Sequence, residues 1–279
     1  MTQAALSHAV SSFDLFQDRL KTELFSHPVI TDNRYCAWFA GAALSQDDVV
    51  DFTRQFSVFS NQFLIAQTQR VINAANVEEM RAAKEILANE LGVVFRARKN
   101  AKQDATGDDV DPDIVGIEGT VDGGTFRFRA AHYEWLLHFA APLGLGFGDL
   151  GRRSLGTPAT LAFCDELIRL YGSDDFSVSA GAGFAVENWA AAGFWKQLID
   201  GLESFSASSG LDLNLGFFRW HDKIEDQHAA HTMAELKDLY FGPLDFDEES
   251  FIAAGRQMLD GVQVFWNGLD ETRKQRRLS

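Results

Sequence analysis

The stretch SQDDVVDFTRQFSVFSNQFLIA, residues 45–66, carries the clearest structural signal in the chain. Ser45 and the two aspartates that follow it are typical of the N-cap and first turn of a helix. Apolar side chains then recur at intervals of three and four residues, at Val49, Phe52, Phe56, Phe59, Phe63 and Ala66. Because this spacing puts them on one helix face, the stretch predicts a long amphipathic helix packed against a core.

The same periodicity continues along most of the sequence. Further helices are predicted over residues 13–24, 76–90, 131–141, 157–171, 179–202, 215–239 and 248–269. Residues 95–130 differ, because a charged run is followed by alternating residues around Asp122-Gly-Gly, which predicts an inserted β-hairpin. No repeat or change of composition divides the chain. We therefore expect one all-α domain over residues 1–279, with about seven to nine helices and an insertion at 95–130.

The composition excludes several functional classes. The 279 residues include 25 Lys+Arg and 40 Asp+Glu, a formal net charge of −15. A nucleic-acid-binding or polybasic membrane-surface protein needs a basic face, so neither partner is expected. No apolar run reaches the roughly 18 residues of a membrane span, and no signal peptide is recognisable at the start. With only two cysteines, Cys36 and Cys164, a disulfide framework is excluded, and we expect a cytoplasmic protein.

Residues 217–228, FFRWHDKIEDQH, hold the sharpest chemical pattern. His221, Glu225 and His228 stand at positions i, i+4 and i+7, which fall within about 60° on one helix face. Two imidazoles and a carboxylate suit iron, manganese or zinc. The alternative interpretation is a solvated polar face.

A further carboxylate, Glu187, is the only acid between Asp175 and Asp200. It lies among small and apolar residues, where burying a carboxylate is unfavourable unless it is paired or bound to a metal. A salt bridge to an arginine is the alternative. The neighbouring Gly181 and Gly183 would allow another helix to approach closely.

With these elements in this order, the chain resembles the heme-oxygenase-like di-metal oxidases. They form the non-heme di-iron branch of a superfamily that also contains thiaminase-type and pyrroloquinoline-quinone-synthase-type proteins. The resemblance spans about residues 13–269. The family has a Glu just before x-Gly at the end of its third helix, matched by NELG at 89–92. A His opens the next helix, matched by HYEWL at 132–136. A Glu in a small-residue context and a final His-x-x-x-Asp/Glu-x-x-His complete the pattern.

The resemblance implies a site for two irons, with manganese as the other candidate metal. Its ligands would be three carboxylates and three histidines: Glu90, His132, Glu187, His221, Glu225 and His228. Two departures from the family stand out. Residues 95–130 lengthen the interval between the first two ligands, which leaves His138 as a rival to His132. Glu225 also stands where many relatives have Asp.

The resemblance further implies an O2-dependent oxidation of a small amino-acid-derived or fatty-acid-like metabolite. The reaction would be N-hydroxylation, C–H abstraction or C–C cleavage, with an external electron donor and a homodimer as open options. Phe56, Phe59 and Phe63 either line an apolar substrate pocket or pack in the core. The insertion, placed between two proposed ligands, is either a lid over the site or a surface decoration.

Two other functions stay open at this point. One is a metal-free thiaminase-like or quinone-synthase-like enzyme on the same fold. Thiaminase-type catalysis uses a cysteine nucleophile, but Cys36 and Cys164 both look like small packing residues. The other is an acidic helical binding protein that takes up neither metal nor oxygen.

Overall fold

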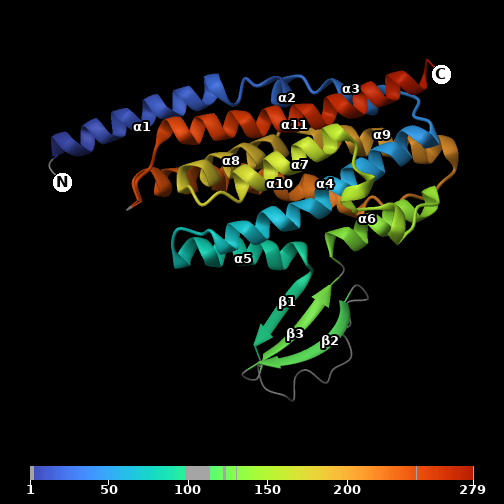
Figure 1. The fold of residues 1–279 in the computed structure, drawn as a ribbon, viewed down its shortest axis with the longest axis horizontal. Coiled ribbons are helices and arrows are strands. Elements are labelled where there is room, and N and C mark those ends of the chain that lie inside the picture. Colours follow the sequence, from blue (N-terminus) through green and yellow to red (C-terminus); the bar gives the residue numbers. More distant parts are fainter. Residues whose placement is uncertain (1–2, 98–113, 122–123, 130, 243, 279) are drawn as a thin grey trace.

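The computed structural model describes the backbone of residues 3–97, 114–121, 124–129, 131–242 and 244–278. Within these ranges, it does not describe the side chains of residues 3–11, 94–97, 114–121, 124–129, 224–232 and 234–235. The described ranges form eleven α-helices and one small sheet (Figure 1). The helices are α1 (Gln3–Glu23), α2 (Pro28–Thr31), α3 (Arg34–Gly41), α4 (Gln46–Ile72), α5 (Val77–Glu90), α6 (His132–Ala140), α7 (Pro158–Tyr171), α8 (Phe176–Ala190), α9 (Phe194–Ser209), α10 (Gly216–Tyr240) and α11 (Glu248–Arg276). The strands are β1 (Val93–Ala97), β2 (Ile114–Val121) and β3 (Gly124–Arg129).

The all-α class with an inserted hairpin is confirmed, and the larger number of helices has local causes. The single helix predicted over 179–202 is two helices, because Gly193 between α8 and α9 has φ +84°, a left-handed conformation that ends a helix. Residues 28–41 hold the two short helices α2 and α3, which we did not predict. Each begins at a side-chain N-cap, His27 for α2 and Asn33 for α3.

The helices form a bundle with an aromatic core. In Figure 1, α1 and α11 lie along one side, α4, α7, α8 and α10 lie in the middle, and α5 lies on the opposite side. The stripe predicted on residues 45–66 faces inward, since Val49, Phe52 and Phe56 are fully buried. None of the helices in the described ranges combines the length and the apolar composition that a bilayer crossing requires.

The inserted sheet lies outside the bundle, beyond α5 and α6 (Figure 1). Its strand order is β1-β3-β2, and both pairs are antiparallel. The predicted hairpin corresponds to β2 and β3, although residues 122–123 of its turn lie outside the described residues. The strand β1 is additional, and it pairs Val93 with Phe128 at the base of the sheet. This pairing returns the chain to the end of α5 before α6 begins.

The middle helix α8 packs closely against α11 through glycines. A Cβ atom added to Gly181 would lie 2.1 Å from the carbonyl oxygen of Phe251 in α11. On α11, a Cβ added to Gly255 would lie 3.2 Å from the carbonyl oxygen of Gly181. The close helix approach predicted from the small residues around Glu187 therefore occurs at Gly181.

Candidate metal centre

Glu90 and His132 meet at the base of the inserted sheet. Glu90 is the last residue of α5 and His132 the first of α6, and they are 42 positions apart in the sequence. The β1–β3 pairing starts at Val93, three residues after Glu90, and ends at Phe128, four residues before His132, so it brings the two helix ends together. As a result, Nδ1 of His132 lies 2.7 Å from Oε2 of Glu90. The side chains are 6 % and 14 % exposed, so the contact is largely shielded from water.

His221 joins this pair from the first turns of α10. Its ring centroid lies 4.9 Å from that of His132. The indole of Trp195 stacks on the His221 ring at 4.7 Å, and Trp220 lies 4.8 Å from the His132 ring. Two imidazoles and a carboxylate from three helices thus share an environment with aromatic walls.

Hydrogen bonding at His221 fixes which ring nitrogen faces a ligand. Its Nδ1 lies 2.7 Å from the carbonyl oxygen of Phe217, which can only accept, so Nδ1 is the donor. Nε2 is therefore the nitrogen that would bind a metal. A backbone carbonyl on the other ring nitrogen is the usual way in which a metal-binding histidine is oriented.

The Glu90–His132 contact fits the spacing of two metal ligands. The Nδ1 atom of His132 is buried and makes no hydrogen bond among the described residues, although Oε2 of Glu90 is 2.7 Å away. Two ligand atoms about 2.1 Å from one ion, at right angles to each other, lie about 3 Å apart. A shared cation would therefore satisfy both atoms.

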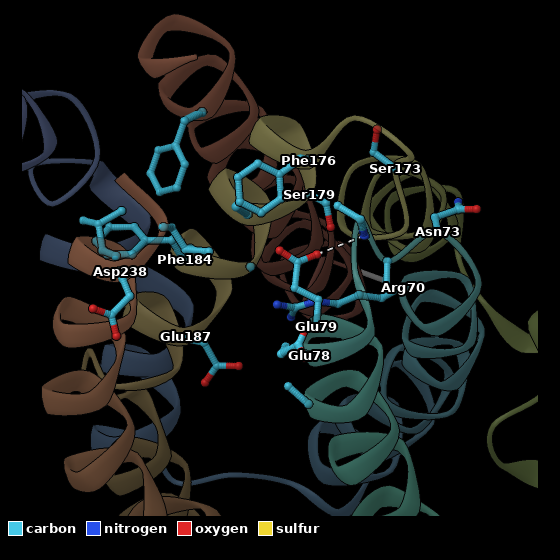
Figure 2. Close-up of a pocket in the computed structure, with 18 of the residues that line it drawn as sticks. Arg70, Asn73, Glu78, Glu79, Ser173, Phe176, Ser179, Phe184, Glu187 and Asp238 are labelled. Carbon is cyan, nitrogen blue, oxygen red and sulfur yellow. Dashed lines mark hydrogen bonds between the residues drawn. The ribbon is translucent and has the colours of Figure 1, made fainter. Parts of the chain in front are cut away.

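Glu187 faces a cavity of about 660 Å³ between α5, α8 and α10 (Figure 2). It is half-buried, on the middle helix α8. On α5, the cavity wall includes Ile86, which lies one helical turn before Glu90. The cavity therefore extends towards the Glu90–His132 contact along α5.

The other two proposed ligands lie on α10, but the side chains of Glu225 and His228 are outside the described residues. Among the side chains that are described, no three His, Cys, Asp or Glu residues form a metal-binding group. The assignment of all six ligands thus stays a prediction. The rival His138 is exposed on α6, whereas His132 is buried against Glu90.

The proposed pocket residues lie in the aromatic core instead of on the cavity wall. Phe56 is 1 % exposed, and its ring contacts Trp195 at 5.8 Å and Phe217 at 6.1 Å. Phe59 packs on Phe163. Neither these residues nor Phe63 line the cavity that Glu187 faces.

Both cysteines are poorly suited to nucleophilic catalysis. Cys36 and Cys164 are fully buried. Burial raises the pKa of the Cys36 thiol well above its usual range and that of Cys164 to about 12. Because the thiolate is the nucleophile, neither residue fits the thiaminase-type alternative.

The sequence analysis did not identify Arg70, which lines the cavity at the end of α4. The sequence does indicate that Arg70 is unusual, because it follows Ala66 by four residues and so lies on the same helix face as the apolar stripe. A charged residue on an otherwise apolar face indicates a buried polar partner or a site. Its guanidinium Nη1 donates to the hydroxyl of Tyr171 at 2.7 Å.

Comparisons with known proteins identify the fold. No protein-family model and no curated protein matches the chain. A solved structure of a CADD-like protein of unknown function from Nostoc punctiforme has a TM-score of 0.61 and 18 % identity, covering 94 % of this chain and 98 % of that one. A TenA homolog from Pseudomonas syringae has a TM-score of 0.60 and 12 % identity, covering 92 % and 93 %.

The name of the fold comes from a third similar structure. It is a domain of unknown function with a heme oxygenase-like fold from Shewanella denitrificans, with a TM-score of 0.58 and 12 % identity, covering 99 % of this chain and 95 % of that one. At these identities the likeness concerns the fold, and it extends over nearly the whole chain. The protein therefore has the heme-oxygenase-like fold, which it shares with a TenA homolog and a CADD-like protein.

Proposed function

We propose that this protein is a non-heme di-iron oxidase or oxygenase that uses O2 to oxidise a small metabolite. The observation that carries the proposal is the buried Glu90–His132 contact, with His221 beside it. A carboxylate and two imidazoles are a donor set that suits iron in O2-dependent enzymes. Glu187, Glu225 and His228 would complete the ligands.

Iron bound at these residues would supply electrons and an open coordination position for O2. The chain itself would hold the ligands and keep water out. Glu90 and His132 are held by the ends of α5 and α6, and the Phe217 carbonyl orients His221. The rings of Trp195 and Trp220 cover the imidazoles, which favours chemistry away from bulk water.

Metal loading of the purified protein tests the proposal. The protein is incubated anaerobically with Fe(II) and desalted, and its iron content is measured for the wild type and for Glu90→Gln, His221→Ala and His138→Ala. We expect about two irons per chain in the wild type and in the His138→Ala control. We expect a marked loss in the other two variants, because each removes a proposed ligand.

Circular dichroism and thermal unfolding of each variant show whether a loss of bound iron comes from the removed ligand or from unfolding of the protein. Exposure of the loaded wild-type protein to oxygen should then consume O2 and give a transient visible absorption band. Failure of the wild type to retain iron, or full retention by a folded His221→Ala variant, would refute the proposed function.

A further inference from the structure

The cavity beside Glu187 has the size of a small-molecule site. Its volume of about 660 Å³ lies within the usual range for ligand pockets, about 300–1,000 Å³. Its walls come from the end of α4, from α5, α8 and α10, and from Phe251 of α11. Figure 2 shows the charged side chains of Arg70, Glu79 and Glu187 directed into the space between these helices.

The charge of the wall is strongly unbalanced. Four carboxylates line the cavity, from Glu78, Glu79, Glu187 and Asp238, and among the described lining residues Arg70 is the one basic side chain. The wall therefore carries a formal charge of 1 − 4 = −3. Such a wall attracts a cation and repels a simple carboxylate.

Arg70 is nevertheless the one described group of the wall that can pair with a ligand carboxylate, although the charges of Glu187 and Glu79 already act on it. Its guanidinium lies 4.7 Å from the ring centroid of Tyr171 and donates to the hydroxyl of that residue, which also accepts from Gln67 at 2.8 Å. Burial raises the pKa of Tyr171, so the phenol keeps its proton and does not cancel the charge of Arg70. A guanidinium has five N–H donors in a planar fork, a geometry that matches a carboxylate.

Apart from Asn73, Ser173 and Ser179, the uncharged part of the wall is apolar and suits a carbon chain. Phe176 and Phe184 come from α8, Leu236 and Leu239 from α10, and Ile86 from α5. The polar groups lie on several helices around these side chains. A ligand that satisfies the whole wall has a carboxylate, at least one ammonium group and a short apolar stem.

We infer that the cavity between α5, α8 and α10 binds a small amine-bearing molecule of the amino-acid type, and not a fatty acid. Its carboxylate pairs with Arg70, and its ammonium groups pair with the wall carboxylates that are not proposed metal ligands, Glu78, Glu79 and Asp238. As the substrate site, this inference rests on the proposed function, since the cavity reaches Glu187 and Ile86 near the proposed ligands. The binding itself needs no metal, so it is tested on metal-free protein.

Calorimetry with matched six-carbon probes tests the inference. The probes are L-lysine, L-norleucine, hexylamine and hexanoate, each titrated into the metal-free protein up to about 10 mM. We expect L-lysine to bind most tightly, L-norleucine more weakly, and hexanoate not at all. Arg70→Met should weaken L-lysine about tenfold or more, because the carboxylate contact is lost, but it should not weaken hexylamine, because the wall becomes more negative.

Two exposed glutamates on α5 provide a matched pair of variants. Glu78 lines the cavity and Glu85 does not, and both are exposed, so each substitution to Gln removes one surface charge from the same helix. Glu78→Gln and Asp238→Asn should each weaken L-lysine about two- to fivefold, and Glu85→Gln should leave it unchanged. If Glu78→Gln and Glu85→Gln changed the affinity for L-lysine equally, the overall charge of the protein and not the cavity would attract the ligand, and the inference would be overturned.

The remaining outcomes separate this inference from the proposed function. Hexanoate binding as tightly as L-lysine, or the absence of binding by every probe, would overturn the inference while leaving the iron measurements untouched. L-lysine binding that depends on Arg70 and Glu78, in a protein that does not retain iron, would support the inference as a binding site and refute the oxidase.

Discussion

Replacing Gly181 by Ala should destabilise the protein, although alanine favours helices. The added Cβ would lie 2.1 Å from the carbonyl oxygen of Phe251 and 2.8 Å from its Cα. Real Cβ contacts are essentially never below 3.0 Å, so α8 and α11 must separate locally by at least about 0.9 Å. The obstacle is backbone within a helix, which cannot rotate away as a side chain can.

The magnitude follows from two opposing effects. Overpacking a core costs typically about 1–3 kcal/mol, and the upper end applies where backbone must move. The helix propensity of alanine over glycine offsets about 0.5–1 kcal/mol of this cost. The net loss should therefore be about 2 kcal/mol, which in a protein of this size lowers the melting temperature by about 4–8 °C.

Gly183, two residues further along α8, is the matched control. Its added Cβ would lie 3.4 Å from Nη1 of Arg70 and 3.5 Å from the Tyr171 ring, which are ordinary contacts. Gly183→Ala should therefore unfold at the wild-type temperature or slightly above it. Thermal unfolding and urea titration, followed by circular dichroism, measure both variants. A Gly181→Ala variant that melts at the wild-type temperature, or an equal loss of stability in both variants, would contradict the prediction.

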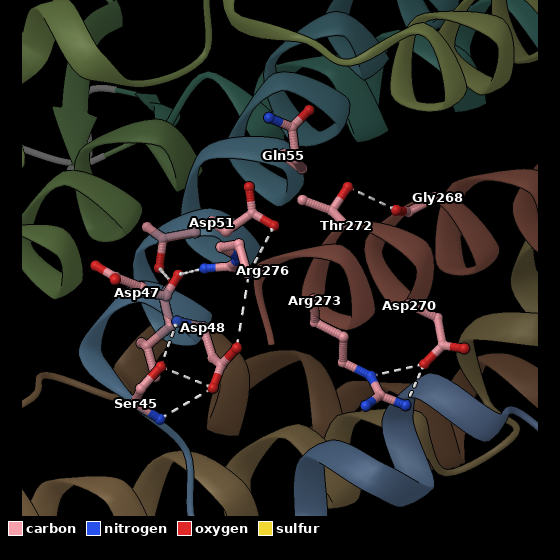
Figure 3. A network of polar contacts seen from close by, with 12 residues as sticks. Ser45, Asp47, Asp48, Asp51, Gln55, Gly268, Asp270, Thr272, Arg273 and Arg276 are labelled. Atoms are coloured by element: carbon pink, nitrogen blue, oxygen red, sulfur yellow. Dashed lines mark hydrogen bonds and ion pairs between the residues drawn. The ribbon is translucent and has the colours of Figure 1, made fainter. Parts of the chain in front are cut away.

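Two further predictions concern single side chains. The thiols of Cys36 and Cys164 are buried and hold their protons. Both should therefore resist alkylation by iodoacetamide at pH 8 in the folded protein and react fully once guanidinium has unfolded it. Rapid alkylation of the native protein would contradict this prediction. Burial alone would raise the pKa of Asp270, but hydrogen bonds from Lys274 and Arg273 outweigh it and lower that pKa below its usual value. Figure 3 shows the contact of Asp270 with Arg273. Its stabilising contribution should be present above about pH 4 and fade as the pH falls through the folded pKa. The difference in unfolding free energy between wild type and Asp270→Asn should shrink accordingly in urea titrations below pH 4, and a difference that stays constant down to pH 2.5 would disprove it.

The helix starts could be predicted from the sequence because their causes lie within a few residues. Ser45 and Asp48 form a capping box, in which each side chain accepts from the backbone N–H of the other residue (Figure 3). Thr157 caps α7 ahead of Pro158 in the same local way. The break at Gly193 also has a local cause, but a glycine inside a helical pattern is compatible with either a continuous or an interrupted helix.

The candidate site depends on contacts that no short stretch encodes. Glu90 and His132 approach each other because β1 pairs with β3, and this register joins residues up to 35 positions apart. Only the family resemblance placed the two residues in one site. The cavity likewise needs the positions of α5, α8 and α10, so the sequence could identify Glu187 as unusual without showing that Arg70 lies on the same wall.

The helix α8 explains why the small residues and Glu187 occur together. At about 100° per residue, Glu187 lies about 240° from Gly181, and Ser179, Ala180 and Gly183 lie between about 160° and 260° from it. These four residues line the cavity, whereas Gly181 faces α11 on the other side. One face of α8 therefore sets the distance to α11, and the opposite face forms the wall of the cavity. A larger residue at 181 would push that wall, with Glu187, into the cavity, so the close packing of α8 and α11 also determines the shape of the proposed substrate site.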